Sequence, residues 1–124
     1  MGDFLDVPMM IGTNKDEGTM YPMLLMPEYF DSPTPPYISR TQYESFVAFQ
    51  LEKYRKGGDL IKEATFQEYT DWTIADDPGA DYFQSMVDFG GDIEFMCPSD
   101  KVTRLHADNG GNVYKYFMTH EPSK

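Results

Sequence analysis

The sequence has 124 residues, of which 40% are hydrophobic and 15% aromatic, a composition typical of one globular domain with a modest core. Its 21 acidic and 10 basic residues give a net charge of −11, which repels phosphate backbones and argues against a nucleic-acid partner. Because no apolar stretch approaches the roughly 18 residues that span a bilayer, we expect no membrane segment in this chain.

The first predicted element is a strand. Residues Val7 to Ile11 are nearly all apolar, which favours a strand buried on both faces of a parallel sheet, with Gly12 to Asn14 as its exit turn. Five prolines between Pro22 and Pro36 interrupt any regular ladder of hydrogen bonds, so we expect a long ordered surface loop there.

The middle of the chain is predicted to be helical. Capping-box signals at Ser39 and Thr41 precede apolar residues with helical spacing, and Gly90-Gly91 and Pro98 predict a break and a kink. The expected helices are residues 40–55, 59–72, 80–89 and 92–107.

The last predicted element is a strand from Val113 to Met118, which is rich in β-branched and aromatic residues. Two strands joined by helical crossovers indicate an α/β protein with a parallel pair. Because two strands cannot form a sheet with a covered core, we expect the chain to be a piece of a larger domain.

Asp16 and Glu17 follow the first strand. Adjacent carboxylates in a loop are most often surface charge, but they could also serve acid/base chemistry or bind a metal. Their position favours a site, since open α/β sheets build their sites at the carboxyl ends of parallel strands. The single Cys97 and two histidines lack the spacing of a zinc site, so no metal site is predicted.

Four motifs resemble those of the carboxylesterase type B and cholinesterase family. Ile11 to Gly18 resembles the loop (V/I)G-x-N-x-x-E-G, and Tyr69 to Trp72 resembles Y-x-D-W. Gly91 to Pro98 resembles GD-x-x-F-x-C-P, and Val113 to Ser123 resembles the late strand V-Y-x-Y-x-F-x-H-x-x-S. Order and spacing agree over nearly the whole chain.

The resemblance implies a partial α/β-hydrolase fold, with residues 1–124 as a fragment of a single hydrolase domain that contributes two late parallel strands and the helices between them. It implies that Glu17 is the acid of the catalytic triad, that Asp16 is a non-catalytic neighbour, and that no cofactor is needed. The substrate would be a carboxylic ester, and the partner would be the remainder of the hydrolase domain.

Two parts of the triad are missing from this sequence. No G-x-S-x-G nucleophile motif occurs in it. The family's catalytic histidine follows the late strand by a longer interval than His120 does, and His106 is expected near a helix C-terminus, where it complements the helix dipole. We therefore expect the isolated chain to be inactive.

Cys97 is expected to be either a small buried side chain or half of a disulfide with a partner elsewhere. The resemblance implies the second role and a secreted parent protein, while the sequence itself indicates no compartment for this chain. Two other functions remain open: part of a non-catalytic cholinesterase-like adhesion or scaffold protein, and a small independent acidic binding protein.

Overall fold

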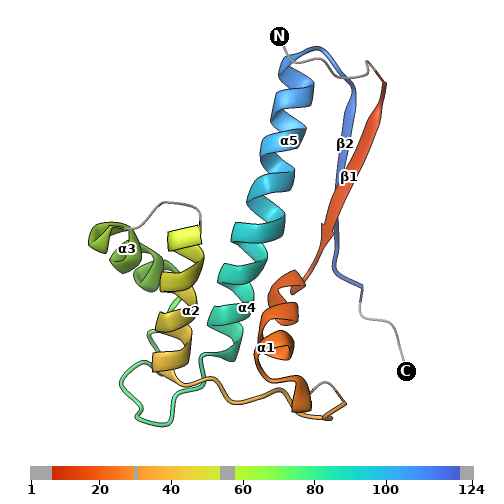
Figure 1. The fold of residues 1–124 in the computed structure, drawn as a ribbon. Helices are drawn as coiled ribbons and strands as arrows, with labels where there is room; N and C mark the ends of the chain where they lie inside the picture. Colours follow the sequence, from red (N-terminus) through yellow and green to blue (C-terminus); the bar gives the residue numbers. More distant parts are fainter. Residues whose placement is uncertain (1–6, 30, 54–57, 121–124) are drawn as a thin grey trace.

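The computed structural model describes residues 7–29, 31–53 and 58–120. Its elements, shown in Figure 1, are β1 (Met9–Asn14), η1 (Glu17–Thr19), α1 (Met20–Leu25), η2 (Pro27–Tyr29), α2 (Arg40–Lys53), α3 (Asp59–Tyr69), α4 (Phe83–Gly91), η3 (Asp92–Met96), α5 (Cys97–Asp108) and β2 (Val113–Met118). The elements η1 and η2 are 3₁₀ helices, and η3 is a π helix.

β1 and β2 form the parallel pair that the sequence predicts. Met9 lies opposite Val113, and Asn14 lies opposite Met118, so both strands end at the same edge. The expected turn at residues 12–14 is wrong, because these residues continue the pairing with β2. The Lys15 N–H extends the ladder further by donating to the Met118 carbonyl at 2.8 Å.

Only one face of the strand pair is covered by the described residues. On that face Lys115 of β2 donates to Asp100 of α5 at 3.0 Å, and α5 runs alongside both strands in Figure 1. The expectation that β1 is buried on both faces is wrong, since the Met10 side chain is 74% exposed. We call this open side the uncovered sheet face; its large side chains are Met10, Tyr114, Tyr116 and Met118.

α4, η3 and α5 form one continuous helical rod, which is the long axis of the molecule in Figure 1. The predicted break at Gly90-Gly91 is therefore wrong, because both glycines lie inside α4. The irregularity falls at η3 instead, where the Cys97 N–H bonds to the Asp92 carbonyl five residues earlier. This wider turn directly precedes Pro98, which cannot donate a helical hydrogen bond.

The predicted loop that begins at Pro22 contains the end of a short helix, α1, which the sequence reading missed. Its apolar residues pack against α4, so tertiary burial outweighs the proline at its first turn, a position that tolerates proline. α2 and α3 confirm two predicted helices, although α3 ends at Tyr69 rather than Trp72. Residues 54 and 55 of the predicted first helix lie outside the described residues.

The hydrophobic core lies among the helices rather than on the sheet. Tyr43 stacks on Tyr82 with ring centroids 5.5 Å apart, and Phe46 meets Phe89 edge-on at 6.0 Å. Burial raises the pKa of the Tyr43 phenol. The buried apolar residues of this core are Ile38, Tyr43, Phe46, Val47, Leu51, Ala80, Tyr82, Met86 and Phe89.

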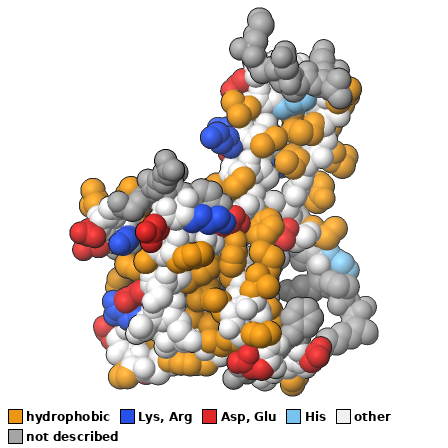
Figure 2. Space-filling view, in the orientation of Figure 1, with side chains coloured by type: hydrophobic (Ala, Val, Ile, Leu, Met, Phe, Trp, Pro, Cys, Tyr) orange, Lys and Arg blue, Asp and Glu red, His pale blue; other side chains and the backbone are white. Residues whose placement is uncertain are grey.

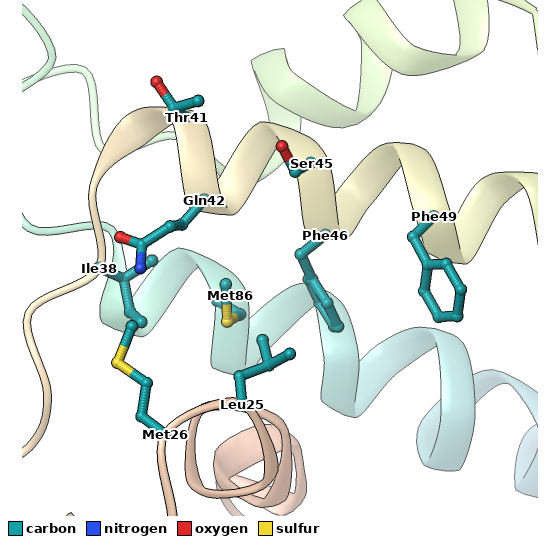
Figure 3. Close-up of a pocket in the computed structure, with 9 residues that line it drawn as sticks. All are labelled: Leu25, Met26, Ile38, Thr41, Gln42, Ser45, Phe46, Phe49 and Met86. Atoms are coloured by element: carbon teal, nitrogen blue, oxygen red, sulfur yellow. The ribbon is translucent and has the colours of Figure 1, made fainter.

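An apolar hollow of about 400 Å³ opens beside this core. Figure 3 shows that Leu25 and Met26 approach it from the end of α1, that Phe46 and Phe49 reach it from α2, and that Met86 forms its floor on α4. Its lining contains no ionisable side chain, so it offers no group for acid/base chemistry.

Two phenylalanines on α2 provide a matched test of this core. Phe46 is 7% exposed and Phe49 is 66% exposed. We expect Phe46→Ala to lower the free energy of unfolding by about 3 to 5 kcal/mol, because it leaves a cavity among the helices, and Phe49→Ala to cost much less. Urea denaturation of the two variants measures the difference, and equal losses would contradict this placement of the core.

The uncovered sheet face predicts the surface behaviour of the 124-residue chain. Tyr114 is 61% exposed and Tyr116 is 47% exposed, and Figure 2 shows hydrophobic side chains along this side of the molecule. We expect the chain to bind a hydrophobic dye such as ANS, and the double substitution Tyr114→Thr and Tyr116→Thr to reduce the dye fluorescence. The control is Leu60→Thr on α3; an equal reduction there would place the dye elsewhere.

Candidate functional site

The candidate site lies where β1 ends. Asp16 has φ 61° and ψ 31°, a left-handed conformation that turns the chain sharply from the strand into η1. Aspartate and asparagine adopt this region more readily than most residues, which accounts for a residue of this type here. As a result, Glu17 begins η1 immediately beyond the carboxyl end of the strand.

The Glu17 carboxylate folds back over the end of β1. Its Oε1 accepts a hydrogen bond from the Asn14 backbone N–H at 2.8 Å, and the side chain is half-buried. An ionised carboxylate has about four acceptor positions, of which this N–H occupies one. The carboxylate is therefore held in place while retaining the capacity to accept a further N–H donor.

Glu17 lines a hollow of about 340 Å³ between the strand exit and the rod. The wall on the rod comes from α4 and η3, and the wall on the sheet comes from the ends of both strands. The residues that line it are Asn14, Lys15, Asp16, Glu17, Gln84, Val87, Asp88, Gly91, Asp92, Met96 and Phe117.

Two contacts fix the sheet side of this hollow to the rod. The amide of Gln84 on α4 donates to Asp88 at 2.8 Å and contacts Asp16 at 3.4 Å. On the other side, the buried Thr13 hydroxyl donates to the Met96 sulfur at 2.7 Å. Asp16 and Glu17 both line the hollow; Asp16 contacts Gln84 of the rod, whereas Glu17 bonds to the end of β1.

The two histidines do not meet Glu17. His106 of α5 contacts the Val7 carbonyl through Nε2 at 3.0 Å, which places it beyond the start of β1. A strand of six residues spans about 20 Å, so His106 lies at the opposite end of the sheet from Glu17. It occupies the last turn of α5, as the sequence predicts. His120 follows β2 and is exposed.

Within residues 7–29, 31–53 and 58–120, no cluster of three or more His, Cys, Asp or Glu side chains could hold a metal ion. No helix in the same ranges is both long and apolar enough to cross a bilayer. Cys97 is an exposed free thiol at the start of α5, so the alternative of a small buried side chain is wrong.

Sequence reasoning predicted a site at Glu17 but did not predict the contacts that hold this part of the chain in place. Asn14 is part of the quoted loop motif, yet a backbone N–H carries no sequence signal. Gln84 and Met96 belong to the rod and come together with the loop only through the tertiary fold. Gly91 belongs to the segment that resembles GD-x-x-F-x-C-P, but the motif predicts no role for it.

The chain is similar in sequence to two cholinesterases. Over 123 residues, 98% of this chain, it is 28% identical to an acetylcholinesterase of Leptinotarsa decemlineata. Over 115 residues, 93% of this chain, it is 32% identical to cholinesterase 1 of Branchiostoma lanceolatum. The matched segments cover only 19% and 31% of those two proteins, respectively.

The model of the carboxylesterase family matches residues 2–124. This family has the α/β-hydrolase fold, and the helices and parallel strand pair described above are consistent with part of that fold. Because the match covers nearly every residue, the chain belongs to the carboxylesterase family.

Proposed function

We propose that this chain supplies Glu17 as the acid of a Ser-His-Glu triad in a carboxylic ester hydrolase. The observation that carries the proposal is the hydrogen bond from the Asn14 N–H to the Glu17 carboxylate at the carboxyl end of β1. It fixes a half-buried carboxylate at the strand edge where α/β folds build their sites, with acceptor capacity left for an imidazole N–H.

In this function Glu17 accepts a hydrogen bond from Nδ1–H of the catalytic histidine. The carboxylate thereby holds the imidazole in one tautomer, so that Nε2 can take the proton from the nucleophilic serine. It also stabilises the imidazolium that forms as the serine attacks the ester carbonyl. The family suggests the substrate class, a carboxylic ester.

The serine and the histidine come, in this proposal, from the remainder of the hydrolase domain, of which residues 1–124 are one part. The uncovered sheet face supports this arrangement, because further strands or helices would bury Met10, Tyr114 and Tyr116. The chain matches only 19% and 31% of the lengths of the two cholinesterases, which agrees with its being one part of a larger domain.

The test replaces two neighbouring carboxylates, one at a time, in a full-length hydrolase that contains residues 1–124. We expect Glu17→Gln to lower kcat by about 10³- to 10⁴-fold, because a neutral amide neither fixes the tautomer nor stabilises the imidazolium. Asp16→Asn removes the same charge and suits the same left-handed turn, and should cost far less. Steady-state kinetics measure both.

Equal effects of the two substitutions would contradict the assignment of Glu17. A full-length protein that hydrolyses no ester before mutation, with another residue in place of the serine, would instead indicate a non-catalytic binding protein of the same fold.

Cys97 gives an independent test of the larger domain. Its exposed thiol is accessible to a partner cysteine outside residues 1–124, as the resemblance to the family implies for a secreted protein. We expect peptide mass mapping of the full-length protein, alkylated without reduction, to find Cys97 in a disulfide. Complete alkylation of Cys97 under these conditions would contradict the pairing and would favour the branch of the family that lacks this disulfide.

A further inference from the structure

Two glycines bring the backbone after Glu17 into direct contact with the helical rod. A Cβ atom on Gly18 would overlap the Val87 carbonyl oxygen and would lie 2.6 Å from the Gly91 nitrogen. A Cβ atom on Gly91 would lie 3.3 Å from the Gly18 nitrogen. Gly18 is buried, so its peptide rests against the last turn of α4 with no side chain between the two backbones.

Local conformation does not explain a glycine at position 91. Its dihedral angles, φ −61° and ψ −46°, are those of an ordinary right-handed helix, which any residue adopts. A glycine inside a helix is less stable than an alanine at the same position. The close approach of Gly18 is the feature that accounts for the missing side chain.

The neighbouring glycine serves a different contact. A Cβ atom on Gly90 would lie 2.6 Å from a ring carbon of Tyr21 and 3.3 Å from a ring carbon of Phe46. Gly90 therefore meets side chains of the core, whereas Gly91 meets the backbone next to Glu17. A substitution at position 90 therefore disturbs the packing of the core, whereas one at position 91 disturbs the placement of the backbone next to Glu17.

The position of Gly18 determines the position of Glu17, since one peptide bond joins them. Gln84 of the rod holds Asp16 just before Glu17, and Met96 of the rod holds Thr13 at the end of β1. The rod thus holds the loop on both sides of Glu17, and Gly91 sets how closely the loop can approach.

We propose that Gly91 is a positioning residue for the triad. Because Gly91 has no side chain, the Gly18 backbone packs directly against the rod, and this close contact aligns the Glu17 carboxylate with the catalytic histidine. The inference rests on the proposed function of Glu17. A side chain at position 91 lifts the loop by a few tenths of an ångström, which changes the carboxylate–imidazole geometry without removing either group.

The test compares Gly91→Ala with the matched control Gly90→Ala in the full-length hydrolase. A misplacement of about 1 Å can cost roughly 10²-fold in rate, so we expect Gly91→Ala to lower kcat by about 10-fold with little change in KM. Its kcat/KM profile should also shift its acidic limb to lower pH, because the imidazolium is less stabilised. Gly90→Ala should lower the melting temperature but leave the acidic limb in place.

A second variant loosens the same junction without adding an atom to the helix. Gln84→Ala removes the amide that contacts Asp16, and should shift the acidic limb in the same direction by a smaller amount. An acidic limb that moves in neither Gly91→Ala nor Gln84→Ala would overturn the inference.

Combination with Glu17→Gln separates this inference from the proposed function. If Gly91 acts through Glu17, Gly91→Ala should cost little further rate in the Glu17→Gln background. Equal fold-losses in both backgrounds would mark Gly91 as merely structural and overturn the inference alone. A Glu17→Gln enzyme with unchanged kcat would overturn the proposed function itself.

Discussion

The parallel pairing of β1 with β2 is the constraint on which the rest of the structure depends. Parallel strands need a crossover connection, and here that crossover contains every helix from α1 to α5. The register places the ends of both strands at one edge, with Asn14 opposite Met118. Both ends therefore form walls of the hollow around Glu17, and α5 closes the return path along the covered face of the sheet.

The helices around α4 contain the hydrophobic core, and the candidate site lies at the carboxyl ends of the strands. The buried aromatic residues pack α2 against α4, which fixes the rod, and the rod in turn fixes the loop that contains Glu17. The hydrophobic core and the candidate site thus lie in separate parts of the structure. The contacts between the strand ends and the rod hold the candidate site in place.

Sequence reasoning predicted the order of strand, helices and strand, the parallel pair, and Glu17 at the strand exit. It failed where tertiary contacts override local signals. Gly90 and Gly91 predict a helix break, yet both lie inside α4. Tyr21 and Gly18 approach these two positions too closely for side chains, which accounts for the glycines. Helix α1 was missed because proline suppresses the local signal, and its burial against α4 appears only in the fold.

The π-helical segment η3 has a consequence for the two halves of the rod. A π turn holds an extra residue, and each residue turns a helix by about 100°, so the faces of α5 are rotated relative to those of α4. One rod can therefore present α4 to the helical core while Asp100 of α5 faces Lys115 on the sheet. The hydrogen bonds of Arg104 and Lys115 lower the pKa of Asp100. The extra residue rotates the side-chain faces of α5 relative to those of α4, so that one helical rod packs against both the helical core and the sheet.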